Sequence, residues 1–283
     1  MTCYLNGTFL PLEDAKIPVL DRGFIFGDGV YEVIPVYHRR PFRLPDHLRR
    51  LSRSLGAIRI PSPHDDAGWI AIIMELVGRH DAPHQSIYLQ VTRGVAKRDH
   101  GFPKDSVPTV FLMTNPLSLP SAEAVERGVP AVTATDNRWY RCDIKSTALL
   151  ANVLLRQFAL DQGAVESVLL RNGFLTEGSA SNIFVVRDGV IATPPKSHLV
   201  LPGITYDVVA DLSRMHGFPY EQRDIAESDV RTADELWLAS STREVLAITT
   251  LDGRPVGTGR PGPIFQRMYA AYQAYKREQC PAP

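Results

Sequence analysis

The chain has few cysteines and no excess of charge of either sign. Its 283 residues include only three cysteines, Cys3, Cys142 and Cys280, which are widely separated and form no Cys-x-x-Cys pair. This argues against a disulfide scaffold or a zinc knuckle and predicts a reducing, cytoplasmic environment. Lys plus Arg and Asp plus Glu each total 31, so the chain has no excess of positive charge that would attract nucleic acid or an acidic membrane surface. We therefore expect small-molecule partners.

Long apolar runs are also lacking. No stretch approaches the roughly 18 uninterrupted apolar residues that a membrane span needs. Residues 4–10 resemble a strand and lack the basic and apolar regions of a secretory signal. His64, Asp65 and Asp66 have no partner cluster at metal-ligand spacing and are better explained as the start of a helix. These absences predict a protein without a metal site, a signal peptide or a membrane span.

Hairpin turns and helical periodicity are present instead. Four turn dipeptides lie between apolar or alternating residues, which is typical of tight antiparallel hairpins: Asn6-Gly7, Asn172-Gly173, Asp188-Gly189 and Asp252-Gly253. Apolar periodicity predicts five helices, at about 47–58 after Asp46 as N-cap, 70–78, 147–162, 205–216 and 264–279. Strands are predicted at 87–91, 110–113, 129–132, 168–170, 183–186 and 236–239. Without a strict βαβ rhythm, this mixture indicates an α+β fold with largely antiparallel sheets.

The segment 115–121 is the best candidate for a domain boundary. It contains two prolines in five residues, which argues against regular structure there. We predict an N-terminal α+β domain at residues 1–118, an interdomain linker at 119–121 and a C-terminal domain at 122–283. Both domains fall within the usual size range.

Two short segments carry the most specific signal: Arg141-Cys142-Asp143-Ile144-Lys145-Ser146 and Leu175-Thr176-Glu177-Gly178-Ser179-Ala180-Ser181-Asn182. They resemble the Schiff-base lysine and the pyridine-nitrogen carboxylate of class IV (fold-type IV) pyridoxal-phosphate aminotransferases, and among these the bacterial D-amino-acid aminotransferases. On position alone Lys145, one of only six lysines, would be read as an ordinary surface residue. The resemblance implies that Lys145 is catalytic and binds pyridoxal 5'-phosphate, and that Glu177 holds the pyridine nitrogen. Tyr206 stands where the family signature usually ends with a basic residue.

The resemblance also implies a phosphate site. It assigns Arg50, the backbone of Ile204, the backbone and hydroxyl of Thr205, and the hydroxyl of Ser241 to the phosphate. A helix N-terminus with free N–H groups is a natural anion site, which fits the expected helix start near 205. On spacing alone, however, Arg50 would lie on a solvated helix face, because Arg49 and Arg53 stand beside it.

The segment Arg93–Pro103 is the candidate for substrate choice. Arg98 and His100 match the Arg-x-His pair that binds the substrate α-carboxylate in D-amino-acid aminotransferases, and Tyr31 would complete this site. A planar guanidinium suits the role because it can meet a carboxylate bidentately. A basic loop between strands is more often only solvated. Arg138, Tyr140 and Arg141 either line the site mouth or mark an exposed strand edge.

The resemblance predicts a two-domain, homodimeric enzyme that binds its cofactor between the domains. It would transfer the amino group of a D-amino acid to a 2-oxo acid, such as 2-oxoglutarate, in a ping-pong cycle. Branched-chain (L) aminotransferases, (R)-amine transaminases and aminodeoxychorismate lyases share the lysine and the glutamate, so they stay open as alternatives. A non-catalytic binding protein of the same fold is the alternative from another class.

Overall fold

The computed structural model describes residues 1–282, which form two compact units. The first unit contains residues 1–118, the segment Ile144–Leu149 and the C-terminal residues from Cys280; the second contains Leu119–Asp143 and Leu150–Gln279. The segment Ile144–Leu149, which includes Lys145, therefore lies in the first unit, where Ser146 forms a β-bridge with Val30. The predicted continuous domains, 1–118 and 122–283 with a linker at 119–121, stay a prediction.

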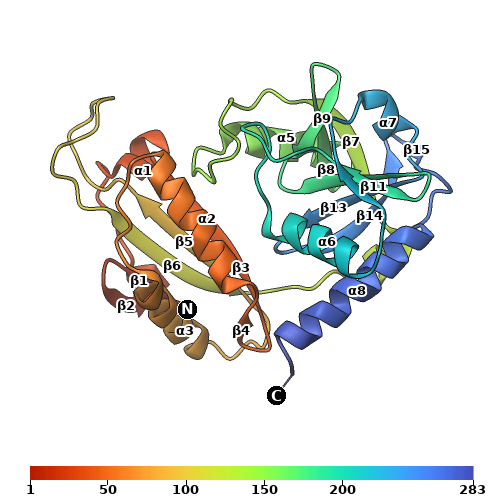
Figure 1. The fold of residues 1–283 in the computed structure, drawn as a ribbon. Coiled ribbons are helices and arrows are strands. Elements are labelled where there is room, and N and C mark those ends of the chain that lie inside the picture. Colours follow the sequence, from red (N-terminus) through yellow and green to blue (C-terminus); the bar gives the residue numbers. More distant parts are fainter. Residues whose placement is uncertain (283) are drawn as a thin grey trace. The chain divides into compact units, whose positions relative to one another are not determined.

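The first unit is built on a six-stranded antiparallel sheet in the order β2-β1-β6-β5-β3-β4 (Figure 1). Its strands are β1 (Thr2–Leu5), β2 (Thr8–Pro11), β3 (Gly29–Tyr37), β4 (Arg40–Pro41), β5 (Gln85–Thr92) and β6 (Thr109–Pro116). Its helices are a 3-10 turn (Leu12–Asp14), α1 (Arg22–Phe26), α2 (Leu44–Ala57) and α3 (Asp66–Gly78). The long strand β3 was not predicted, and β6 extends beyond the predicted range 110–113 at both ends.

Helices α2 and α3 cover one face of this sheet. Helix α2 packs against β3, and α3 packs against β1 and β6 (Figure 1). The predicted stripe Leu48, Leu51 and Leu55 is buried in the core between helix and sheet, as helical periodicity requires. The predicted N-cap of α2 is wrong, because Arg43 occupies the cap position and Asp46 lies in the first turn. There Asp46 accepts hydrogen bonds from Arg43 and Arg49. Its negative charge also interacts favourably with the positive end of the helix dipole.

In α3 the predicted buried face is partly wrong. Ile70 and Met74 are 41% and 44% exposed, whereas Ile73 and Val77 are buried. The helix is apolar on most sides, so periodicity alone could not identify the face that meets the sheet.

The second unit contains a nine-stranded sheet in the order β12-β11-β10-β13-β14-β7-β8-β9, with β15 paired to β14. The strands are β7 (Val129–Thr135), β8 (Glu166–Arg171), β9 (Phe174–Gly178), β10 (Asn182–Arg187), β11 (Val190–Thr193), β12 (Tyr220–Gln222), β13 (Glu235–Ser240), β14 (Glu244–Leu251) and β15 (Arg254–Pro255). The pairs β11–β12, β14–β7 and β7–β8 are parallel and the other pairs are antiparallel. The prediction of largely antiparallel sheets is confirmed.

Helices pack on this sheet and extend the core. They are α4 (Ala122–Arg127), α5 (Leu150–Asp161), α6 (Ile204–Met215), α7 (Glu227–Arg231) and α8 (Pro263–Gln279). Helix α5 packs on β7 and β8, while α6 and α8 pack on each other and on β13 (Figure 1). In residues 1–282, no helix has both the length and the apolar character needed to cross a membrane.

All four predicted hairpin turns are confirmed. Asn6-Gly7 joins β1 to β2, Asn172-Gly173 joins β8 to β9, Asp188-Gly189 joins β10 to β11, and Asp252-Gly253 joins β14 to β15. Every one of these eight residues has a positive φ, which the primed hairpin turns require. The Asn172-Gly173 turn leads directly into β9 and so fixes where Glu177 lies.

Candidate active site

Lys145 is held in the first unit by its backbone. Its N–H donates to the Ser54 hydroxyl at 3.3 Å, and its carbonyl accepts from the Tyr31 N–H at 2.9 Å. The side chain is half-buried, and its Nζ lies 4.1 Å from the centroid of the Tyr31 ring. The structure therefore brings two predicted site residues, Lys145 and Tyr31, into direct contact. The ring face favours a cation and limits the directions in which the amine can point.

Arg50 belongs to a buried cluster on α2 and β3. Its Nε and Nη2 donate to Glu32 at 2.7 and 2.8 Å, and His47 Nδ1 is 2.8 Å from the same carboxylate. Arg50 is 4% exposed, whereas the neighbouring Arg49 side chain is 70% exposed. The interpretation of Arg50 as part of a solvated helix face is therefore wrong. Glu32 and His47 were missed because nothing in the local sequence indicates that they meet.

The electrostatics of this cluster depend on burial. Burial raises the pKa of Glu32, but Arg50 and His47 outweigh it and hold that pKa well below its ordinary value. Burial also lowers the pKa of His47 and so disfavours its charged form. Glu32 thus stays ionised and fixes the guanidinium of Arg50 in a single orientation.

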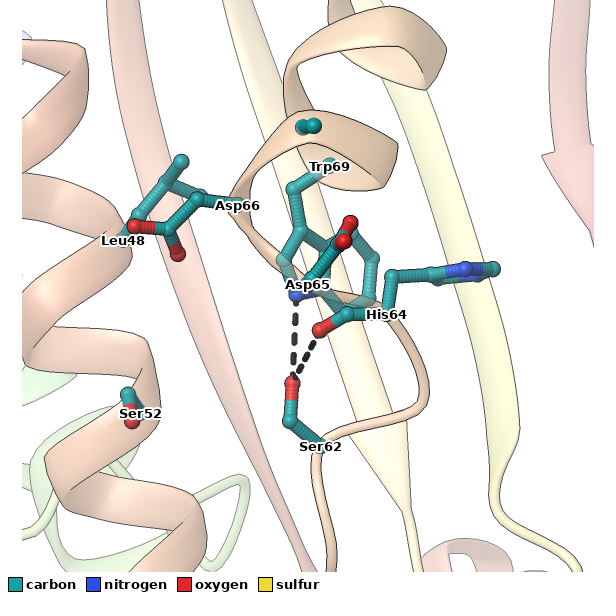
Figure 2. Close-up of a pocket in the computed structure, with 8 residues that line it drawn as sticks. Leu48, Ser52, Ser62, His64, Asp65, Asp66 and Trp69 are labelled. Carbon is teal, nitrogen blue, oxygen red and sulfur yellow. Dashed lines mark hydrogen bonds between the residues drawn. The ribbon is translucent and has the colours of Figure 1, made fainter.

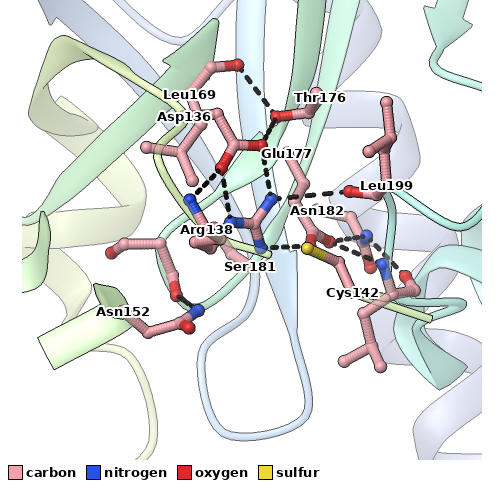
Figure 3. A network of polar contacts seen from close by, with 12 residues as sticks. Asp136, Arg138, Cys142, Asn152, Leu169, Thr176, Glu177, Ser181, Asn182 and Leu199 are labelled. Carbon is pink, nitrogen blue, oxygen red and sulfur yellow. Dashed lines mark hydrogen bonds and ion pairs between the residues drawn. The ribbon is translucent and has the colours of Figure 1, made fainter. Parts of the chain in front are cut away.

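Glu177 lies on β9 in the second unit and is fixed from two sides (Figure 3). Its Oε1 accepts from Arg138 Nη1 at 2.5 Å. Its Oε2 accepts from Asn182 Nδ2 at 3.1 Å and from the Leu201 N–H at 3.0 Å. Burial raises the pKa of Glu177 to about 7, although the guanidinium of Arg138 opposes this rise. Arg138 is 7% exposed, so the alternative of an exposed strand edge is wrong for this residue.

The N-terminus of α6 carries the remaining predicted cofactor residues of the second unit. Ile204 and Thr205 are the first two residues of this helix and are buried, and Gly203 is the N-cap. A Cβ on Gly203 would lie 2.0 Å from the side-chain oxygen of Asn182. The glycine therefore lets α6 begin beside the residue that holds Glu177. Ser241 lies half-buried in the turn between β13 and β14.

Arg98 and His100 lie on an exposed loop of the first unit and share one aromatic neighbour. The Arg98 guanidinium is 5.3 Å from the centroid of the Phe26 ring, and the His100 ring centroid is 5.6 Å from it. The Arg22 side chain donates to the carbonyl of Asp99 at 2.6 Å, between the two basic residues. Arg22 is itself paired with Asp28. The structure thus places both basic side chains near the Phe26 ring, on a loop that a buried arginine anchors.

A surface hollow of about 510 Å³ lies elsewhere on the first unit (Figure 2). It is lined by residues of α2 and of the start of α3, among them His64, Asp65 and Trp69, and by none of the predicted site residues. Asp65 is the N-cap of α3 and accepts from the Gly68 N–H at 2.8 Å. This confirms that the His64-Asp65-Asp66 segment starts a helix.

The residues present fit the requirements of pyridoxal phosphate. The cofactor needs an amine, a carboxylate for its pyridine nitrogen and an anion site. Lys145 supplies a half-buried amine, Glu177 supplies a buried carboxylate, and the N-terminus of α6 offers N–H groups that a helix leaves unpaired. Gly203 keeps that helix end free of a side chain.

Comparison with known proteins gives a consistent result along the chain. The sequence model of the family described as amino-transferase class IV matches residues 29–251. The D-alanine aminotransferase of Bacillus licheniformis is 39% identical over 273 residues, which cover 96% of each chain. The D-alanine aminotransferase of Staphylococcus aureus strain MW2 is 37% identical with the same coverage.

Solved structures of similar proteins share the whole fold. The branched-chain amino acid aminotransferase of Escherichia coli superposes with a TM-score of 0.90 at 27% identity, covering 96% of this chain and 93% of that one. The T.th. branched-chain amino acid aminotransferase, solved with pyridoxamine 5'-phosphate, has a TM-score of 0.91 at 27% identity, with coverages of 99% and 95%. The predicted family, fold type and cofactor are confirmed. The chain belongs to the class IV aminotransferases, which are pyridoxal-phosphate-dependent transaminases of fold type IV.

Proposed function

We propose that this chain is a D-amino-acid aminotransferase, which moves the amino group of a D-amino acid such as D-alanine to a 2-oxo acid such as 2-oxoglutarate in a ping-pong cycle. The observation that carries the proposal is the similarity to D-alanine aminotransferases along 96% of the chain. Arg98 and His100, which both lie near the Phe26 ring, support it, because a guanidinium and an imidazole suit the α-carboxylate of an amino acid.

Lys145 and Glu177 carry the chemistry in this proposal. Bound pyridoxal phosphate supplies an electron sink for negative charge that develops at the substrate Cα. Lys145 would hold the cofactor through its Nζ, and the same amine would remove the proton from the substrate Cα and later return a proton. The Tyr31 ring limits the positions open to that amine. Glu177 binds the pyridine nitrogen through its carboxylate.

The remaining residues bind and orient. Arg50, the backbone N–H groups of Ile204 and Thr205, and the hydroxyls of Thr205 and Ser241 bind the phosphate. The contact of Arg50 with Glu32 supports this role, because it fixes the guanidinium before any anion arrives. Tyr31, Arg98 and His100 bind the substrate, with the two basic residues on its α-carboxylate.

We also propose that the enzyme is a cytoplasmic homodimer with amino acids and 2-oxo acids as its partners. Four apolar residues at helical spacing on α5 support the dimer, because an exposed apolar stripe of this kind marks an interaction surface. They are Leu150, Val153, Leu154 and Phe158, which are 73%, 58%, 61% and 45% exposed. The three cysteines are buried, and no disulfide joins any two of them within residues 1–282, which supports the cytoplasm.

A donor panel tests the substrate. D-alanine, L-leucine and (R)-1-phenylethylamine are offered separately with 2-oxoglutarate as acceptor, and we expect D-alanine to be the preferred donor. Activity restricted to L-leucine would instead support a branched-chain aminotransferase, the activity named for solved structures that are 27% identical to this chain. Preference for the (R)-amine would indicate an amine transaminase of the same fold, and lyase activity on aminodeoxychorismate would indicate an aminodeoxychorismate lyase.

Covalent labelling tests the cofactor site and the non-catalytic alternative. After loading with pyridoxal phosphate, borohydride reduction should fix the label on the peptide that contains Lys145. The Lys145→Ala variant should lose the visible absorption band, while a matched control, Lys16→Ala at an exposed lysine, should keep it. A wild-type protein that binds no cofactor would identify a non-catalytic binding protein.

A further inference from the structure

The carboxylate of Glu177 is one end of a buried chain of charges (Figure 3). Asp136 and Arg138 lie directly after β7 and form the inner part of this chain. Arg138 donates to Asp136 through its Nε and Nη2, each at 2.9 Å, and through its backbone N–H at 3.1 Å. The remaining nitrogen, Nη1, donates to Glu177 at 2.5 Å. The guanidinium therefore joins the two carboxylates in one fixed geometry.

Asp136 is in turn contacted by Thr176 and Arg171. Thr176, the residue before Glu177, donates its hydroxyl to Asp136 Oδ2 at 2.8 Å. Arg171 Nη2 lies 3.0 Å from Asp136 Oδ1 and donates to the carbonyl of Arg138 at 2.8 Å. Burial raises the pKa of Asp136, yet its contacts with Arg138 and Thr176 bring it down to about 2. Asp136 is thus ionised near neutral pH and orients Arg138.

Burial raises the pKa of Glu177 to about 7, and the guanidinium of Arg138 opposes that rise. Burial alone disfavours a charged carboxylate, and Asp136 adds a like charge nearby. The thiol of Cys142 also faces this group; burial raises its pKa to about 11, so it stays neutral. In this cluster Arg138 is the cation that donates directly to Glu177, so its attraction acts on that carboxylate at the shortest range.

We propose that Arg138, oriented by Asp136, is a positioning residue that lowers the proton affinity of Glu177, so that the proton shared by Glu177 and the cofactor's pyridine nitrogen stays on the nitrogen. The inference rests on the proposed function of Glu177 and extends it. Two bases that share one proton place it on the more basic of the two. The guanidinium lowers the proton affinity of the carboxylate and so leaves the proton on the ring, where it strengthens the electron sink.

The test loads the protein with pyridoxal phosphate labelled with ¹⁵N in the ring and measures the ¹⁵N chemical shift at neutral pH, a readout that does not depend on turnover. We expect a protonated nitrogen in the wild type and a shift toward the unprotonated value in Arg138→Met. Arg138→Lys keeps the charge and should stay closer to the wild type. The matched control is Arg231→Met, because Arg231 also joins two carboxylates, Glu227 and Asp252, but is 44% exposed.

Steady-state kinetics complete the test. For Arg138→Met we expect kcat with D-alanine to fall by at least about tenfold, with KM changed by less than about threefold, since the effect acts after binding. A wild-type ¹⁵N shift in loaded Arg138→Met would overturn the inference and leave Arg138 a purely structural role. Loss of ring protonation in Arg138→Lys as complete as in Arg138→Met would overturn the role of charge.

A second variant covers the case in which Arg138→Met does not fold. Asp136→Asn retains the guanidinium but removes the carboxylate that orients it, so the ¹⁵N shift should move part of the way toward the unprotonated value, by less than in Arg138→Met. A wild-type ¹⁵N shift in loaded Asp136→Asn would refute the inference that Asp136 orients Arg138. Failure of the wild type to bind the cofactor at all would instead refute the proposed function, and the two results are distinguishable.

Discussion

Replacing Glu32 with Gln removes the counter-ion of a buried guanidinium. The Glu32 side chain is fully buried, accepts two hydrogen bonds from Arg50 at 2.7 and 2.8 Å, and contacts His47 at 2.8 Å. Removing one partner of a buried ion pair leaves the other charge uncompensated and costs about 3–5 kcal/mol. We expect Glu32→Gln to lower the free energy of unfolding by this amount.

Urea unfolding of the cofactor-free protein at pH 7 measures this loss. The matched control is Glu75→Gln, because Glu75 also pairs with an arginine, Arg79, but its side chain is 51% exposed. Exposed pairs of this kind contribute about 0.3–0.5 kcal/mol, so the control should unfold almost as the wild type does. A Glu32→Gln variant within about 1 kcal/mol of the wild type would show that this pair does not hold α2 to β3.

The difference in free energy of unfolding between wild type and Glu32→Gln should change with pH in one direction. The pKa of Glu32 is lowered in the folded protein, since Arg50 and His47 outweigh the opposing effect of burial. Such a carboxyl contributes stability that is present above its unfolded pKa, about 4.3, and is lost as the pH falls toward the folded value. The difference between wild type and Glu32→Gln should therefore persist down to about pH 5 and shrink below about pH 4. A difference that grows below pH 4 would contradict the assignment.

Four further predictions concern single side chains. Phe26→Ala removes the ring under two basic residues and should raise KM for D-alanine about two- to fivefold; an unchanged KM would contradict this. Gly203→Ala should weaken cofactor binding in equilibrium titration, whereas Gly56→Ala, where a Cβ meets nothing within 4 Å, should not. Because burial raises the pKa of Cys142 to about 11, a thiol reagent at pH 8 should modify it only after unfolding. Because burial raises the pKa of Glu177 to about 7, the cofactor-free protein should lose stability as the pH rises from about 4.3 to 7; urea unfolding of Glu177→Gln should lack this loss.

The sequence determined the features that depend on a few neighbouring residues. The four turn dipeptides identified their hairpins because positive φ at consecutive positions is a local backbone preference. The stripe on α2 identified its buried face, and the segments around Lys145 and Glu177 identified the family. Each of these signals lies within about twelve residues, over which spacing along the chain and position in space are closely related.

The tertiary structure alone decided which charges meet. Arg49, Arg50 and Arg53 are equivalent by local pattern, and Arg50 is buried because β3, which the sequence analysis missed, carries Glu32 to it. Arg138 lies 39 positions from Glu177, and nothing in its neighbourhood predicts the contact. A local pattern records backbone preference and exposed faces, whereas a buried ion pair depends on how separate strands and helices pack. For that reason the sequence could name Lys145 and Glu177, but not the charged residues that hold Glu177 and Arg50 in place.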